Sequence, residues 1–263
     1  MKLQNRSIGE RIFNAFNYLF LSLLALVFFL PLWHVFMYSI SDIYHSNVTG
    51  LFLWPRGLDL GVYQTLLVPG SLVLSGLRVS AIVTIVGTAL GTLISAMLAY
   101  PISKPHLKGR RLVMFLVIFT MIFSGGFIQD YLLIRNMGLY DSLWALILPL
   151  MLDGFNIIIF RNYFQGIPLE IEESAKIDGA GHFCVFFRII LPISTAVLAT
   201  VALFICIRYW NDYFSSVLYI SSNDKWSLAQ VLRDMIQASI ASNANTMINK
   251  ARTNIAQLRN VTI

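Results

Sequence analysis

The sequence contains few charged residues. Only 12% of its 263 residues are Asp, Glu, Lys or Arg, about half of the roughly 25% found in an ordinary soluble domain. Hydrophobic residues make up 57% of the chain, and its mean hydropathy is +0.71. This composition excludes a typical soluble globular protein and indicates that lipid covers most of the molecular surface.

Several chemical signatures are also missing. The chain has two cysteines, which lack metal-ligand spacing and lie outside the predicted outer loops, so neither a disulfide nor a metal site is expected. It has no G-x-x-x-x-G-K-[ST] phosphate loop and no nucleic-acid-binding signature. We therefore expect no catalytic residues and no cofactor, and any ATP would be bound by another chain. The four histidines are dispersed, at His34, His45, His106 and His182.

Long apolar runs dominate what is present. A spanning helix needs about 20 predominantly apolar residues, and the backbone inside a bilayer must satisfy its own hydrogen bonds. The first run is too long for a signal peptide and has no cleavage site after it, so we predict that it is retained. The sequence thus predicts an all-α, multi-pass bundle forming one domain, 1–263. The expected spans are 16–40, 72–100, 112–128, 143–160 and 189–220.

Basic residues predict the orientation, since Lys and Arg accumulate in cytoplasmic loops. The N-terminal segment and the loop "SKPHLKGRR" (103–111) are the strongly basic ones. We therefore predict a cytoplasmic N-terminus in a bacterial inner membrane. The tail is basic for an outer segment, but long segments obey this rule weakly. Within it, 225–240 is expected to form an amphipathic helix. The predicted inner segments are 102–111 and 161–188, and the outer ones are 41–70, 130–142 and 221–263.

One short charged stretch, "EESAKIDGAGHFCVFFRIILP" (172–192), interrupts the apolar pattern. Pro168 suits the start of a helix, and acidic residues follow in its first turns, where they favour the helix dipole. The Asp-Gly pair at 178–179 indicates a turn in which Gly179 adopts positive φ. Apolar residues then recur at helical spacing up to Pro192. We predict a short helix, a turn and a second helix at the inner membrane surface, in a loop spanning 168–188.

The order and spacing of residues in this loop resemble a known signature motif. Glu173-Ser174-Ala175, then Gly179, Ile189 and Leu191-Pro192, resembles the signature E-A-A-x3-G-x9-I-x-L-P of permease subunits of bacterial ABC importers. The only departure is Ser174, which adds a hydroxyl but little volume. The alternative interpretation is an interfacial loop whose charges are merely solvated.

The resemblance extends over about 12–240. The segments "FSGGFIQDYLLIRNMGLYDSLWALILP" and "GLFLWPRGLDLGVYQTLL" are similar to the carbohydrate branch of this family, in particular to permeases for uronate-type oligosaccharides. Gln129 departs from the proline expected there. The resemblance implies the type I permease fold, a second homologous permease, an ATPase dimer, an external solute-binding protein and a sugar cargo. Family members end with a sixth helix, so we expect another apolar run beyond Ile263.

The resemblance also implies a role for the short helix. It would be the coupling helix that docks in a cleft of the cytoplasmic ATPase, with Glu173 facing a basic partner and small side chains permitting close approach. Ala180 completes that small-residue face. The residues expected to couple to the ATPase are Glu172, Glu173, Ser174, Ala175, Asp178 and Gly179.

Polar residues inside spans usually face a cavity or the bundle interior. The end of the fifth run offers hydrogen-bonding groups and flat aromatic rings for a sugar. Alternatively, its aromatic residues form an interfacial belt and Arg208 pairs with Asp212 one turn away. Asp153 can equally mark a helix break beside Gly154. The candidate path residues are Asp153, Arg208, Tyr209, Trp210, Asn211, Asp212 and Tyr213.

Two other classes of function compete with the importer. A secondary transporter driven by an ion gradient would use Asp153 and Asp212 as ion-linked carboxylates, but it leaves the charged loop unexplained. A membrane-embedded enzyme is disfavoured because no catalytic constellation is visible.

Overall fold

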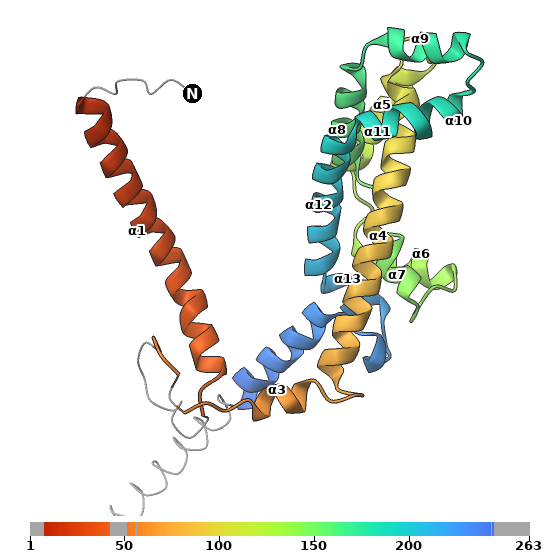
Figure 1. Cartoon of the computed structure of the whole chain (residues 1–263). Helices are drawn as coiled ribbons and strands as arrows, with labels where there is room; N and C mark the ends of the chain where they lie inside the picture. Colours follow the sequence, from red (N-terminus) through yellow and green to blue (C-terminus); the bar gives the residue numbers. More distant parts are fainter. Residues whose placement is uncertain (1–7, 43–51, 56, 243, 245–263) are drawn as a thin grey trace, which may run out of the picture. The chain divides into compact units, whose positions relative to one another are not determined.

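The computed structural model describes residues 8–42, 52–55, 57–242 and 244, and within these ranges the chain is helical, without named strands (Figure 1). Contacts divide the chain into two compact units, 1–68 and 69–263, where the sequence predicted a single domain. The most apolar stretch of the long helix in the first unit has no buried side chains.

The first unit contains α1 (Ile8–Ser39) and α3 (Gly61–Leu66). Residues 12–39 of α1 are long and apolar enough to cross a membrane. The segment after α1 folds back on its end. The Trp33 indole N–H donates to the Leu53 carbonyl at 3.1 Å, and the Phe52 N–H donates to His34 Nδ1 at 2.9 Å. Two hydrogen bonds thus hold residues 52–53 against the last turns of α1.

The second unit is built around α4 (Leu72–Ser103), which packs against α8 (Gly154–Gln165) and α12 (Thr195–Asn211) (Figure 1). Small residues on α4 permit this close approach. A Cβ on Gly91 would lie 2.9 Å from the Met151 carbonyl, and Ala96 and Ala99 are completely buried. The core of the bundle therefore lies along the inner face of α4.

Three of the expected spans are broken. The run at 112–128 is α5 (Arg110–Ile122), which ends before Gly126 at φ +87 and bends by 112° into α6 (Phe127–Asn136). The run at 143–160 is α7 (Leu143–Ile147) followed by the separate helix α8. The run at 189–220 bends by 84° at Ser194 before α12 begins. Glycine, proline and capping residues therefore break helices that the apolar runs alone predict to be continuous.

The short charged stretch folds as predicted. The helix α9 runs from Leu169 to Ile177 and is followed by short helical pieces that lead into α12. The tail helix predicted over 225–240 is present but begins later, at 228, and runs to 242, because a 3-10 turn occupies 223–225. The remaining elements are α10 (His182–Val185), the π-helical turn η1 (Phe186–Ile190), α11 (Leu191–Ile193), α13 (Phe214–Tyr219) and the 3-10 turn η2 (Asn223–Lys225).

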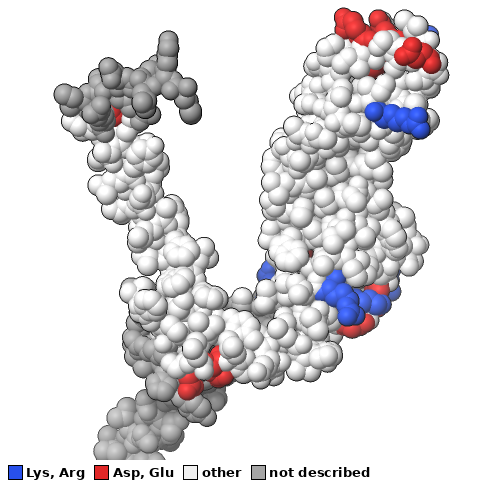
Figure 2. Space-filling view, in the orientation of Figure 1, with Lys and Arg blue, Asp and Glu red and all other residues white. Residues whose placement is uncertain are grey.

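Charged residues mark the two ends of the second unit. On the face shown in Figure 2, Lys, Arg, Asp and Glu gather at these ends, and the helices between them are almost free of charge. The predicted inner segments 102–111 and 161–188 meet at one end, where Lys104 bonds Glu172. The predicted outer segments 130–142 and 221–263 meet at the other, where Lys225 bonds Asp141. The pairing of loops agrees with the alternation expected from the charge pattern.

Candidate functional site

The helix α9 stands at one end of the bundle with its boundaries set by local sequence. Pro168 precedes it with φ −56°, and Glu170 and Glu172 occupy its first turn, where carboxylates interact favourably with the helix dipole. Gly179 follows at φ +81, the left-handed conformation predicted for it, and the Ala180 N–H donates to the Ala175 carbonyl at 2.9 Å. A short, well-terminated helix is thus presented at this surface.

The two sides of α9 differ. Glu172 and Ala175 face the bundle and are 3% and 8% exposed. Ala175 therefore belongs to the core and not to a small-residue docking face. The Ser174 hydroxyl donates to the Glu170 carbonyl at 2.9 Å, so it is satisfied by its own helix. The predicted coupling residues that face solvent are Glu173, Ser174, Asp178 and Gly179.

Ile177 is a surface residue that the sequence reasoning missed. Its apolar side chain is 85% exposed at the end of α9. Leu169 and Ile171 of the same helix are also exposed, at 41% and 37%, so α9 offers apolar as well as charged surface. The detectable signal for Ile177 was its position directly before the Asp-Gly turn, on the face opposite Ala175.

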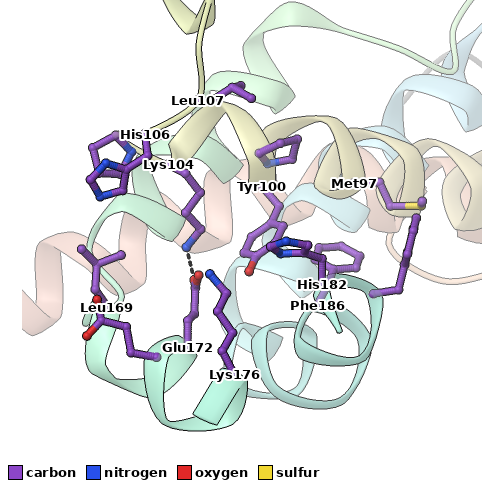
Figure 3. Close-up of a pocket in the computed structure, with 14 residues that line it drawn as sticks. Met97, Tyr100, Lys104, His106, Leu107, Leu169, Glu172, Lys176, His182 and Phe186 are labelled. Carbon is purple, nitrogen blue, oxygen red and sulfur yellow. Dashed lines mark hydrogen bonds and ion pairs between the residues drawn. The ribbon is translucent and has the colours of Figure 1, made fainter. Parts of the chain in front are cut away.

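The inner side of α9 is fixed by an ion pair. The Lys104 ammonium at the end of α4 donates to the Glu172 carboxylate. The pair lies beside a cavity of about 540 Å³ formed by the end of α4, the following loop, α9 and α10. Lys176 and His182 also border this cavity (Figure 3). Sequence reasoning missed Lys104 as a partner, although it placed 102–111 and 161–188 on the same side of the membrane.

Two candidate path residues form a second ion pair. Arg208 of α12 donates to the carboxylate of Asp153 at 2.5 Å. The expected alternative, a pair between Arg208 and Asp212 along one helix, is wrong, because Asp212 instead accepts the Ser215 N–H at 3.3 Å. Asp153 does not lie inside a helix. It is the N-cap of α8, accepting the Phe155 N–H at 2.9 Å, which confirms the predicted helix break.

The other candidate path residues point in different directions. Tyr209 is 3% exposed, and its hydroxyl donates to the Ile147 carbonyl at 2.6 Å, so it belongs to the core. Trp210 is 43% exposed. The Asn211 amide donates to the carbonyl of Ile207 in its own helix at 2.9 Å. The Tyr213 ring lies under the Arg233 guanidinium at 4.0 Å. These residues therefore do not converge on one pocket within this chain.

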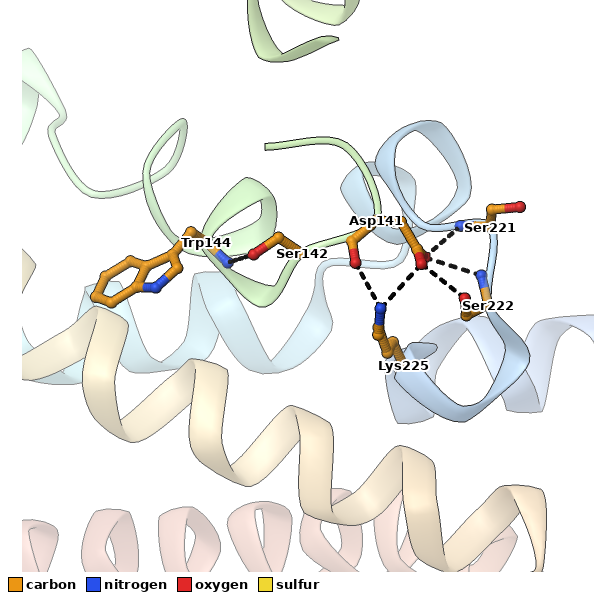
Figure 4. A network of polar contacts seen from close by, with 6 residues as sticks. All are labelled: Asp141, Ser142, Trp144, Ser221, Ser222 and Lys225. Atoms are coloured by element: carbon orange, nitrogen blue, oxygen red, sulfur yellow. Dashed lines mark hydrogen bonds and ion pairs between the residues drawn. The ribbon is translucent and has the colours of Figure 1, made fainter. Parts of the chain in front are cut away.

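Asp141 joins two loops at the opposite end of the bundle. Its carboxylate accepts hydrogen bonds from the Ser222 hydroxyl at 2.6 Å and from the Lys225 ammonium at 2.9 Å (Figure 4). The backbone N–H groups of Ser221 and Ser222 donate to it as well. The bond from Ser222, followed by that from Lys225, holds the pKa of Asp141 well below its usual range. Sequence reasoning missed this cluster, for which only the "YDS" turn was a signal.

Comparison with known proteins gives consistent results. The family model described as "Binding-protein-dependent transport system inner membrane component" matches residues 79–251. The chain is 42% identical over 249 residues to Protein LplC of Bacillus subtilis (strain 168), covering 94% of this chain and 84% of that protein. It is 40% identical over 230 residues to the polygalacturonan/rhamnogalacturonan transport system permease protein YtcP of the same organism, covering 88% and 80%.

A solved structure is also similar. It is described as the crystal structure of a bacterial ABC transporter involved in the import of the acidic polysaccharide alginate. The match has a TM-score of 0.81 at 30% identity and covers 87% of this chain and 81% of the other. The similarity therefore extends over most of both chains.

Proposed function

Since this chain belongs to the family of binding-protein-dependent transport system inner membrane components and is the permease subunit of an ABC importer, we propose that its cargo is a sugar or oligosaccharide. Relatives named for polygalacturonan, rhamnogalacturonan and alginate support this proposal. These polymers carry uronate carboxylates, so an acidic oligosaccharide is the first cargo to test.

The charged and apolar residues on the exposed side of α9 support the proposal that this helix couples the permease to its ATPase. Glu173 and Asp178 face solvent there beside the exposed Ile177. This combination of charge and apolar surface fits a cleft on a protein partner that offers basic and apolar side chains. The partner is the ATPase dimer, which binds and hydrolyses ATP, whereas this chain holds no cofactor. A second homologous permease and an extracytoplasmic solute-binding protein complete the importer.

The chain crosses the bacterial inner membrane several times with its N-terminus in the cytoplasm. The basic loop that follows α4 lies at the same end of the bundle as α9, which supports a cytoplasmic position for both. A cysteine in place of Lys176 should react with a charged maleimide only after the membrane is permeabilised. Reaction in intact spheroplasts would reverse this topology.

The translocation path runs along the part of α12 that carries Arg208, Trp210 and Asn211. All three are exposed in the isolated chain. The guanidinium and amide suit sugar hydroxyls and carboxylates, and the indole suits the flat face of a pyranose ring. The second permease would close the other side of this path.

Two measurements test the proposed function. In vesicles holding the complete importer, uptake of galacturonate oligosaccharides should require internal ATP and persist when ionophores dissipate ion gradients. Uptake that needs no ATPase and stops with ionophores would favour the gradient-driven transporter.

The second measurement concerns binding of the ATPase. Glu173→Lys places a positive charge where a basic partner is expected, which commonly costs a few kcal/mol. Co-purification of the ATPase should fall, while Glu170→Lys, further from the Asp-Gly turn on the same helix, should have a smaller effect. Equal retention of the ATPase by the Glu173→Lys variant and the wild type would count against docking through α9.

A further inference from the structure

The coupling helix has one charged connection to the bundle. Glu172 is the only charged residue of α9 that forms an ion pair with another element among the residues that the structure describes. Its side chain is 5% exposed, and that of Lys104 is 20% exposed. The partners are 68 residues apart in sequence. Lys104 directly follows the last residue of α4, so this bond joins α9 to the end of the central helix.

Aromatic contacts extend this connection. The Lys104 ammonium lies 4.6 Å from the centre of the Tyr100 ring. The Tyr100 ring in turn lies 5.2 Å from the Phe186 ring in η1 and 6.0 Å from the Phe164 ring in α8. The charge pair therefore lies in a cluster to which α4, α8, α9 and the entry to α12 all contribute.

Space beside the pair limits the other contacts of α9. The cavity of about 540 Å³ lies between α9 and the last turns of α4 (Figure 3). Packing of α9 onto the core is carried mainly by Ala175. A displacement of α9 can therefore reach α4 most directly through Glu172 and Lys104.

The helix α4 reaches the other end of the bundle. Its 32 residues correspond to about 48 Å of helix. Near its start, the Ser80 hydroxyl accepts the Leu228 N–H at 2.8 Å. A Cβ on Gly76 would lie 3.2 Å from Leu228 Cα, so the two backbones are in close contact. The helix α4 therefore connects the end of the bundle that carries α9 with the segment around Leu228.

We infer that Lys104 and Glu172 are positioning residues that transmit the movement of α9 to α4 during the transport cycle. This inference rests on the proposed docking of α9 to an ATPase. It separates two tasks within one short helix, because the exposed side binds the partner and the buried pair passes its movement to the membrane helices.

Removing one charge should separate these tasks. Without Lys104, the buried Glu172 carboxylate lacks its counter-ion. The charged link between α9 and α4 is then broken, because Lys104 is the ion-pair partner of Glu172. The exposed residues of α9 still reach the ATPase. The expected defect is ATP hydrolysis that no longer drives import, and not loss of the complex.

The test uses the complete importer in vesicles and measures ATP hydrolysis and sugar uptake in the same sample. In Lys104→Met and Glu172→Gln, the ATPase should co-purify as in the wild type, while sugar imported per ATP falls at least about fivefold. Lys104→Arg, which keeps the charge, and the exchange Lys104→Glu with Glu172→Lys should restore most of that ratio. Lys108→Met, an exposed lysine of the same loop, is the matched control and should change nothing.

Three outcomes would overturn the inference. If both single variants import as much sugar per ATP as the wild type, the pair does not transmit the movement of α9 to α4. Loss of ATPase binding in both variants, without recovery in Lys104→Arg or the exchange, would assign the pair a role in folding only. A wild-type importer that takes up sugar without any ATPase would overturn the proposed function itself, and the inference with it.

Discussion

The guanidinium of Arg208 lies 2.5 Å from the carboxylate of Asp153 and joins α12 to the start of α8. The other carboxylate oxygen of Asp153 accepts the Phe155 N–H at 2.9 Å. One aspartate therefore ends the irregular segment before α8, begins that helix and neutralises a cation in an apolar region. Ionisable residues within a membrane are costly unless they are paired in this way.

The two roles of Asp153 can be separated by substitution. Asp153→Asn keeps an oxygen that can cap α8 but removes the charge, whereas Asp153→Ala removes both. We expect Asp153→Ala to be less stable than Asp153→Asn by about 1 kcal/mol, the usual contribution of an N-cap. Thermal unfolding of the detergent-solubilised protein measures the difference.

The charge contribution is tested by removing both partners. Adding Arg208→Met to Asp153→Asn leaves no unpaired charge, so the double variant should recover much of the stability lost in Asp153→Asn. Stability that falls further in the double variant would show that Arg208 contributes through contacts other than this pair.

A second prediction concerns the turn after α9. Gly179 has φ +81, and a Cβ there would contact nothing within 4 Å, so only backbone strain opposes a side chain. Gly179→Ala should destabilise the turn by about 1–2 kcal/mol. Gly181→Ala is a matched control, because Gly181 has φ −70 and equally open space. Binding of the ATPase should weaken only in the first variant, and equal binding by both would contradict the assigned conformation.

The sequence predicted α9 well because its signals are local. Pro168, the acidic first turn and the Asp-Gly pair lie within a dozen residues and act on their own backbone. The pairing of Glu172 with Lys104 involves residues 68 positions apart, and that of Arg208 with Asp153 spans 55. Helical spacing suggested Asp212 for Arg208, and only the packing of α12 against α8 selects Asp153.

Apolar runs predicted the presence of helices better than their ends. The run at 143–160 shows no charge before Asp153, yet the helix stops at Ile147 and resumes at Gly154. Hydropathy measures the preference of a segment for lipid and is insensitive to a cap formed by one side chain. The aromatic residues near the end of α12 illustrate the same limit, because composition cannot distinguish the buried Tyr209 from the exposed Trp210.

Acid should weaken the hydrogen bonds by which Asp141 connects the two loops. Hydrogen bonds from Ser222 and Lys225 lower the pKa of this carboxyl in the folded protein. A lowered folded-state pKa gives stability that is fully present above the unfolded value, about pH 4, and is lost as the pH falls through the folded value. The stability advantage of wild type over Asp141→Asn should therefore stay constant from about pH 7 to about pH 5 and shrink as the pH falls below about 4.

Thermal unfolding at several pH values measures that advantage. Asparagine tolerates the positive φ of 60° found at this position, so the backbone turn is kept while the charge and one acceptor oxygen are lost. Asp224→Asn, an exposed carboxylate in η2, controls for the general effect of acid. An advantage over Asp141→Asn that grows with acid would contradict the assigned hydrogen bonds.

A close contact between α4 and α12 gives the last prediction. Gly87 of α4 lies against the ring of Tyr209, and a Cβ on Gly87 would clash with that ring. The ring cannot easily move away, because it is 3% exposed and its hydroxyl donates to the Ile147 carbonyl. Gly87→Ala should therefore destabilise the bundle by about 1–3 kcal/mol through overpacking.

A double-mutant cycle identifies Tyr209 as the cause. Tyr209→Leu removes both the ring and its hydrogen bond, so this variant is itself less stable than the wild type. In that background, however, the alanine at position 87 meets a smaller, flexible side chain. Its additional effect should be smaller than in the wild type by more than about 0.5 kcal/mol, the limit within which independent sites add. Additive effects in thermal unfolding would mean that the cost of Gly87→Ala arises elsewhere along α4, and not from its contact with α12.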